Sequence, residues 1–231
     1  MYLDPRQDHV RFTLAGFLLL CSAGTARCQT SANLTLVSAY TARGVALDPH
    51  PVLQLRVEHD LAAGWYAGAF ASPTGLDGGR QDQLIAYGGR AQRLTSTLTW
   101  DAGFSHSAFL RGARFSYSEF YAGLALERSS ARLFYSPAYY GEGRTVYLDL
   151  NTSYPLGDRV SLALHAGLLH PFGAYHDEGR DEARDAGDVR ISLATSVGDV
   201  RLQAGWQGKW HPYLPGSAPA RALSASASII F

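Results

Sequence analysis

Residues 52–59 read VLQLRVEH, and their pattern indicates the type of fold. Leu53, Leu55 and Val57 alternate with Gln, Arg and Glu. An extended chain sends successive side chains to opposite faces, whereas a helix repeats its apolar positions every three to four residues. The stretch therefore predicts a β-strand with one apolar and one polar face.

The same alternation recurs along the rest of the chain and predicts about twelve strands. Most runs are about 9–12 residues long, which matches the roughly 9–11 residues of a tilted membrane-crossing strand better than the roughly 5–6 of strands in soluble proteins. The expected strands lie near residues 32–43, 52–60, 64–73, 83–92, 97–106, 116–127, 131–137, 145–154, 159–169, 188–197, 199–210 and 220–231.

Short and long connections alternate between these strands. Short links occur near residues 61–63, 93–96 and 155–158, and long ones near 44–51 and 170–187. Tight turns at one end and long loops at the other are typical of outer-membrane barrels. The pattern predicts an all-β protein, an up-and-down antiparallel transmembrane β-barrel.

The composition is compatible with this fold and excludes others. Hydrophobic residues make up 46% of the 231 residues, so the chain has enough apolar surface to fold. Its mean hydropathy of −0.10 excludes a bundle of transmembrane helices, but a barrel hides its apolar residues at alternate positions. Twenty basic and twenty acidic side chains give no net charge, which leaves no electrostatic footprint for nucleic acid.

The first residues have the features of an export signal. Arg6 and Arg11 precede an apolar stretch over residues 12–23, which is too short to span a bilayer. Small residues allow cleavage after Ala26 or after Cys28, and a buried N-terminal helix is the alternative. We expect a signal peptide over 1–28 and a single barrel domain over 29–231. The mature chain would then contain no cysteine, since Cys21 and Cys28 lie in the leader.

The chain ends in an alternating strand whose last residue is Phe231. A terminal strand that ends in an aromatic residue is typical of barrels that the assembly machinery of the outer membrane recognises. We therefore interpret Phe231 as a barrel-assembly signal. Together with the leader, it predicts the Gram-negative outer membrane as the location, with lipid, the assembly machinery and small solutes as partners.

A family resemblance follows from several short motifs in order. Residues 36–44, LVSAYTARG, resemble the opening strand of the TorF-family putative porins through Ser38, Tyr40, Arg43 and Gly44. Further similar stretches are GWYAGAFAS at 64–72, YSEFYAG at 117–123, FYSPAYYG at 134–141, YPL at 154–156 and LHAG at 164–167. The resemblance implies an outer-membrane barrel and a porin-like role, without naming a solute or functional residues.

If the apolar faces contact lipid, the charged residues on the opposite faces line the interior. Basic residues slightly outnumber acidic ones there, which indicates a weak preference for anions. Neighbouring opposite charges could instead pair and fill the lumen. The candidate pore-lining residues are Arg56, Glu58, Arg90, Asp101, Glu119, Glu127, Arg132, Asp149, Arg159, Asp188, Arg190, Arg201 and Lys209.

Three functional hypotheses remain. The first is a porin for passive diffusion of small solutes, and the second is a closed structural or ligand-binding barrel. The third, an outer-membrane hydrolase, is the least favoured, because Ser161 and His165 would lie about 13 Å apart along a strand at roughly 3.3 Å per residue. We expect neither an enzyme nor a cofactor. The acidic segment 176–188 lacks the spacing of a calcium loop and is interpreted as a solvated outer loop, with no metal site expected.

Overall fold

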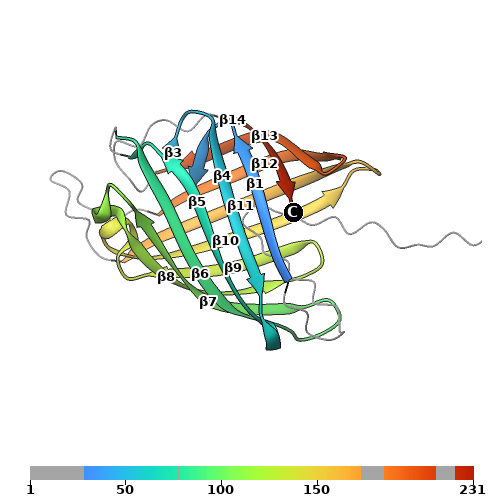
Figure 1. Ribbon diagram of the computed structural model, residues 1–231, viewed down its shortest axis with the longest axis horizontal. Coiled ribbons are helices and arrows are strands. Elements are labelled where there is room, and N and C mark those ends of the chain that lie inside the picture. The colour runs from blue at the N-terminus through green and yellow to red at the C-terminus, as the bar shows by residue number, and fades with distance from the viewer. Residues whose placement is uncertain (1–28, 77–78, 173–184, 212–221) are drawn as a thin grey trace, which may run out of the picture.

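The computed structural model describes residues 29–76, 79–172, 185–211 and 222–231 (Figure 1). The predicted leader and residues 176–184 of the acidic segment lie outside this part. Within these ranges, none of the helices has the length and apolar character needed to span a bilayer. The elements are β1 (Gln29–Val37), β2 (Tyr40–Ala42), β3 (Val45–Asp48), β4 (Val52–Asp60), η1 (Ala62–Gly64), β5 (Trp65–Thr74), β6 (Gln81–Arg93), β7 (Thr99–Phe109), η3 (Ala113–Phe115), β8 (Tyr117–Ala125), β9 (Ser129–Ser136), η4 (Tyr139–Gly141), β10 (Arg144–Pro155), β11 (Val160–Phe172), β12 (Ala186–Val197), β13 (Val200–Trp210) and β14 (Leu223–Ile230).

Twelve of these strands form one closed antiparallel barrel, in which each strand is paired on both sides. The seam joins β1 to β14, with Asn33 opposite Ile230 at one end of the register. Beyond the seam, the backbone N–H of Phe231 donates to the carbonyl of Ala32 at 2.8 Å, and the reverse bond measures 3.2 Å. The predicted up-and-down barrel of about twelve strands is confirmed.

The two ends of the barrel differ in their connections. The links from β4 to β5, β6 to β7, β8 to β9, β10 to β11 and β12 to β13 meet at one end, here the short-turn end. The longer connections meet at the opposite, long-loop end. Because the strand number is even, β1 begins and β14 finishes at the short-turn end (Figure 1).

The opening of the chain differs from the predicted strand over 32–43. β1 ends at Val37, and residues 40–48 form a separate hairpin of β2 and β3, here called the inner hairpin. Its turn consists of Arg43 and Gly44, with φ angles of 49° and 72°. Positive φ angles at both central residues are characteristic of a type I′ turn, which is common in two-residue β-hairpins. The hairpin could not be predicted from the alternation of side chains, because strands of the wall and of the hairpin have the same period of two.

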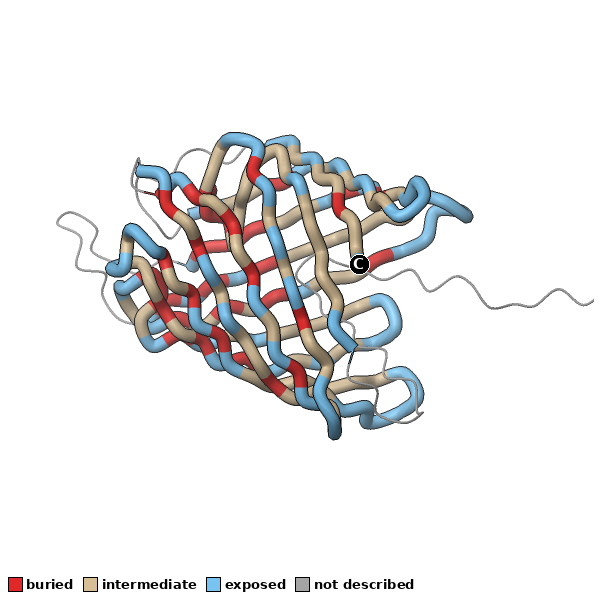
Figure 2. Tube along the Cα trace, viewed as in Figure 1, coloured by how far each residue is buried: buried red, intermediate tan, exposed pale blue. Residues whose placement is uncertain are grey.

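Side chains of opposite character occupy the two faces of the wall, and buried and exposed positions alternate along many strands (Figure 2). Leu53, Phe120 and Leu193 are between 52% and 57% exposed, whereas Glu119 and Ser192 are only 5% and 2% exposed. This is the reverse of the usual arrangement in soluble proteins, where large apolar side chains are mostly buried and charged ones mostly exposed. This barrel therefore has an apolar outer surface around a polar interior.

Inward-facing tyrosines of the wall lie over glycines of the neighbouring strand. Tyr87 of β6 is opposite Gly68 of β5, and Tyr121 of β8 is opposite Gly103 of β7. A Cβ atom added at either glycine would collide with the tyrosine side chain and with a backbone carbonyl. Covering a glycine with an aromatic ring from the next strand helps to set the register of a sheet.

The substitution Gly103→Val tests this packing. We expect it to destabilise the barrel by about 1–3 kcal/mol, as overpacking commonly does, because backbone as well as side chain must move. The measurement is the yield of folded protein, read as the band that changes its gel migration on heating. Gly157→Ala is the control, since nothing lies within 4 Å of a Cβ atom at this exposed turn. Equal yields for the two variants would contradict the packing argument.

Candidate functional site: the lumen and its inner hairpin

The barrel encloses a cavity of about 360 Å³, and the inner hairpin forms part of its wall. Tyr40, Thr41 and Arg43 of the hairpin all line it. The Tyr40 hydroxyl donates to Gln83 of β6 at 2.9 Å, and Gln207 of β13 donates to the Thr41 hydroxyl at 3.1 Å. The hairpin is thus tied to two separate strands of the barrel.

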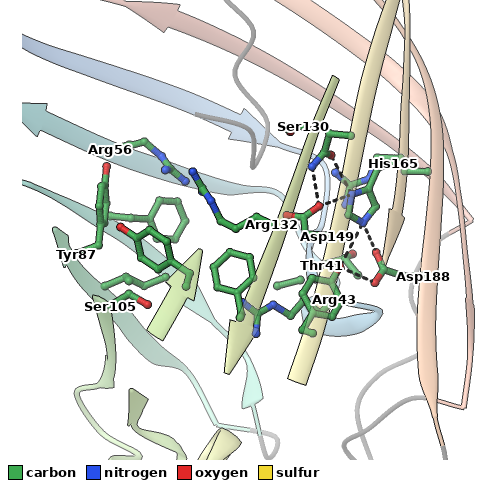
Figure 3. A pocket seen from close by; sticks show the side chains of 18 of the residues that line it. Thr41, Arg43, Arg56, Tyr87, Ser105, Ser130, Arg132, Asp149, His165 and Asp188 are labelled. Carbon is green, nitrogen blue, oxygen red and sulfur yellow. Dashed lines mark hydrogen bonds and ion pairs between the residues drawn. The ribbon is translucent and has the colours of Figure 1, made fainter. Parts of the chain in front are cut away.

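Arg43 makes the most extensive contacts of the hairpin turn. Its guanidinium donates two hydrogen bonds to the carboxylate of Glu119 on β8, at 2.5 and 2.9 Å. The guanidinium carbon also lies 4.6 Å from the ring centre of Phe134 and 4.5 Å from that of Tyr147. Paired donors facing a carboxylate make a strong, directional contact, and the rings add cation–π attraction. Arg43 therefore anchors the hairpin across the lumen (Figure 3).

An apolar cluster packs next to Arg43, toward the long-loop end. Tyr139 and Tyr140 of η4 are 1% and 2% exposed, and their rings contact that of Tyr117. Burial raises the pKa of both η4 tyrosines, so their hydroxyls stay neutral. The cluster joins the hairpin to the loops and comprises Val45, Leu47, Leu76, Phe109, Tyr117, Tyr139, Tyr140, Tyr147, Leu169 and Ala186.

A second polar network lies on β10, β11 and β12. His165 sits between two carboxylates, with Nε2 at 2.7 Å from Asp188 and Nδ1 at 3.2 Å from Asp149 (Figure 3). The Tyr147 hydroxyl donates to Asp188 at 3.1 Å, and the Asn151 amide donates to Asp149 at 2.6 Å. These side chains satisfy one another, as buried polar groups generally do. In the described part of the chain, no cluster of three potential metal ligands was found.

Most residues predicted to line a pore face the interior. Glu58 accepts a hydrogen bond from Tyr87 at 3.0 Å, and Asp101 accepts one from Arg132 at 2.5 Å. Lys209 lies beside Gly44 at the turn of the inner hairpin. Those that line the cavity itself are Arg56, Glu119, Arg132, Asp149, Asp188, Arg190 and Arg201.

Three of the predicted residues lie elsewhere, and these placements correct the prediction. Arg90 shares a strand face with the exposed Leu84, and its guanidinium lies 5.9 Å from the ring of the exposed Trp65. Period two places Arg90 on the outer face, because the inward positions of β6 are the odd-numbered ones. Glu127 and Arg159 were included in the predicted strands 116–127 and 159–169, but both are exposed in short turns, just outside β8 and β11.

The central role of Arg43 was not predicted from the sequence. Arg43 belongs to a motif of the family resemblance, but it was predicted to end the wall strand over 32–43. The available signal was the Arg-Gly pair followed by the apolar residues 45–47, which together fit a tight hairpin turn. The contacts of His165 and Tyr147 depend on strands that only the fold brings together.

The fold is that of known outer-membrane porins. The KdgM porin superposes with a TM-score of 0.55 at 11% identity, covering 87% of this chain and 98% of that one. The NanC porin gives a TM-score of 0.57 at 12% identity with the same coverage. A structure of the KdgM porin in complex with disordered oligogalacturonate gives 0.51 at 11% identity, again with the same coverage. At these identities the similarity establishes the closed barrel.

Sequence comparison identifies the family. A family model described as a bacterial protein of unknown function (Gcw_chp) matches residues 22–181. Because the match covers more than half of the chain, the chain belongs to this family. No curated protein matched the sequence.

The substitution Arg43→Ala tests the anchoring of the inner hairpin. Removing one partner of a buried ion pair costs about 3–5 kcal/mol, so the hairpin should detach far more often. Hydrogen exchange of residues 40–48 in detergent would then speed up by at least a hundredfold.

Arg111→Ala is the matched control, because Arg111 and Asp82 form an exposed pair at 3.7 Å at the long-loop end. Exposed pairs contribute about 0–1 kcal/mol, so exchange of the hairpin should stay unchanged. Unaltered exchange in both variants would show that Arg43 does not hold the hairpin.

Proposed function

We propose that this chain is a β-barrel of the Gram-negative outer membrane that lets small solutes pass, with a weak preference for anions. The observation that carries the proposal is the inverted arrangement of side chains, apolar outside and polar inside. It agrees with the porin-like role implied by the TorF-family resemblance, and with the word porin in the names of two structural neighbours.

Hydrocarbon is the solvent that best suits the outer surface. Many large apolar side chains are exposed around the barrel, among them Leu53, Phe120 and Leu193. Contact between so much apolar surface and water would be unfavourable. The wall strands are paired on both sides, as the absence of water in a bilayer core requires. The short-turn end would face the periplasm, and the long loops would face outward.

Passage follows from the polar cavity, and the inner hairpin controls it. The hairpin crosses the lumen next to the apolar cluster, so a permeant must pass beside it or displace it. We therefore propose a narrow channel in which the contact between Arg43 and Glu119 restricts flow.

The anion preference rests on the charges around the cavity. Six arginines line it, against three carboxylates. Glu119 is bound to Arg43, while Asp149 and Asp188 surround His165. An excess of guanidinium groups favours anions in a confined lumen.

A closed ligand-binding barrel is the second candidate, and the docked inner hairpin favours it. A hydrolase has less support. The nitrogens of His165 contact Asn151, Asp149, Asp188 and Tyr147, so no aliphatic hydroxyl is poised there as a nucleophile. Export by the leader and recognition of Phe231 by the assembly machinery complete the proposal. Phe231 is 72% exposed at the barrel seam, where a partner could reach it.

Planar-bilayer recording on protein purified from outer membranes tests passage. We expect small discrete conductance steps and a reversal potential displaced toward that of the anion in a potassium chloride gradient. Arg43→Ala should raise the open conductance severalfold, since the hairpin no longer holds its position. The control is again Arg111→Ala, which should match the wild type.

Silence from both the wild type and Arg43→Ala would reject passage and leave the closed barrel. A cation-selective current would reject the anion preference alone.

A further inference from the structure

Two arginines face one another across the cavity. Arg56 projects from β4 and Arg132 from β9, and their guanidinium groups point toward one another (Figure 3). Like charges in this arrangement repel, so an anion between them would stabilise both. Arg43 of the inner hairpin is not part of this pair, because its guanidinium is bound to Glu119.

Only one of the two arginines has a carboxylate partner. Arg132 donates through Nη2 to Asp101 at 2.5 Å. Among the described residues, Arg56 forms no ion pair, and Glu58, two residues along the strand, accepts a hydrogen bond from Tyr87. Arg56 thus presents a charge that the protein does not neutralise by direct pairing.

Aromatic rings flank both guanidinium groups. Arg56 lies 5.5 Å from the ring centre of Phe70 and 5.8 Å from that of Tyr87, and Arg132 lies 5.1 Å from that of Tyr121. Rings that attract the face of a guanidinium leave its N–H edge available for in-plane donation. A carboxylate accepts that edge with two parallel hydrogen bonds.

We propose that the space between Arg56 and Arg132 binds a small aromatic carboxylate. The carboxylate would bridge the two guanidinium groups, and the ring would pack on the aromatic wall of the cavity. The cavity volume of about 360 Å³ falls within the roughly 300–1,000 Å³ of small-molecule sites. This inference rests on the proposed function, since it names the class of solute that the lumen selects.

Calorimetric titration of the detergent-solubilised protein with three probes tests the site. Benzoate carries both the ring and the charge, benzamide lacks the charge, and acetate lacks the ring. We expect benzoate to bind at least tenfold more tightly than either of the others. Equal affinity for benzamide would overturn the role of the arginines, and equal affinity for acetate would overturn the role of the rings.

Arg56→Gln should weaken benzoate binding at least tenfold, and Arg56→Lys should lie between it and the wild type, because lysine keeps the charge without the paired donors. Arg159→Gln, in an exposed turn, is the control and should bind as the wild type does. Unchanged affinity in Arg56→Gln would contradict the site. The three-probe comparison uses the wild-type protein, so it remains decisive if a variant fails to fold.

Bilayer recordings on the same preparation separate this inference from the proposed function. Conductance steps without benzoate binding would overturn the aromatic-carboxylate site and leave passage intact. Benzoate binding without conductance would support the site and reject passage in favour of a ligand-binding barrel.

Discussion

The hydrogen bonds between β1 and β14 determine the architecture of this protein. They close the sheet, so every wall strand has a hydrogen-bonded neighbour on both sides. Only closure lets apolar residues such as Leu193 face outward in a bilayer without leaving backbone groups unpaired in hydrocarbon. Closure also creates an enclosed interior. Polar side chains and the inner hairpin occupy part of this interior, and the cavity is the space that they leave.

The inner hairpin changes what the barrel can do. Residues 40–48 place a buried ion pair and part of an apolar cluster inside the closed wall. The bond between Arg43 and Glu119 forms within a ring of aromatic side chains, where water competes poorly. The ion pair joins the turn of the hairpin to β8, whereas the hydrogen bonds of Tyr40 and Thr41 hold its first strand. A change at Arg43 is therefore expected to loosen the turn.

Local pattern predicted the wall well and the interior poorly. The alternation around Leu53 and Arg56 sets both strand type and facing, because the two faces meet different solvents. Arg90 was misplaced because charge was given more weight than its parity with Leu84. The inner hairpin could not be separated from a wall strand, since both have the same period. The surroundings of Arg43 depend on which strands meet across the lumen, and that information is not local.

Site-directed spin labelling through β12 tests whether the apolar outer face of the barrel contacts lipid. Both native cysteines lie in the predicted leader, so single cysteines at positions 190–193 can be labelled cleanly. In lipid bilayers, labels replacing Ile191 and Leu193 should be accessible to oxygen, and labels replacing Arg190 and Ser192 to a water-soluble relaxation agent. Two results would contradict a barrel whose outer face contacts lipid: accessibility that does not alternate along residues 190–193, or alternation in which positions 190 and 192 are the ones accessible to oxygen.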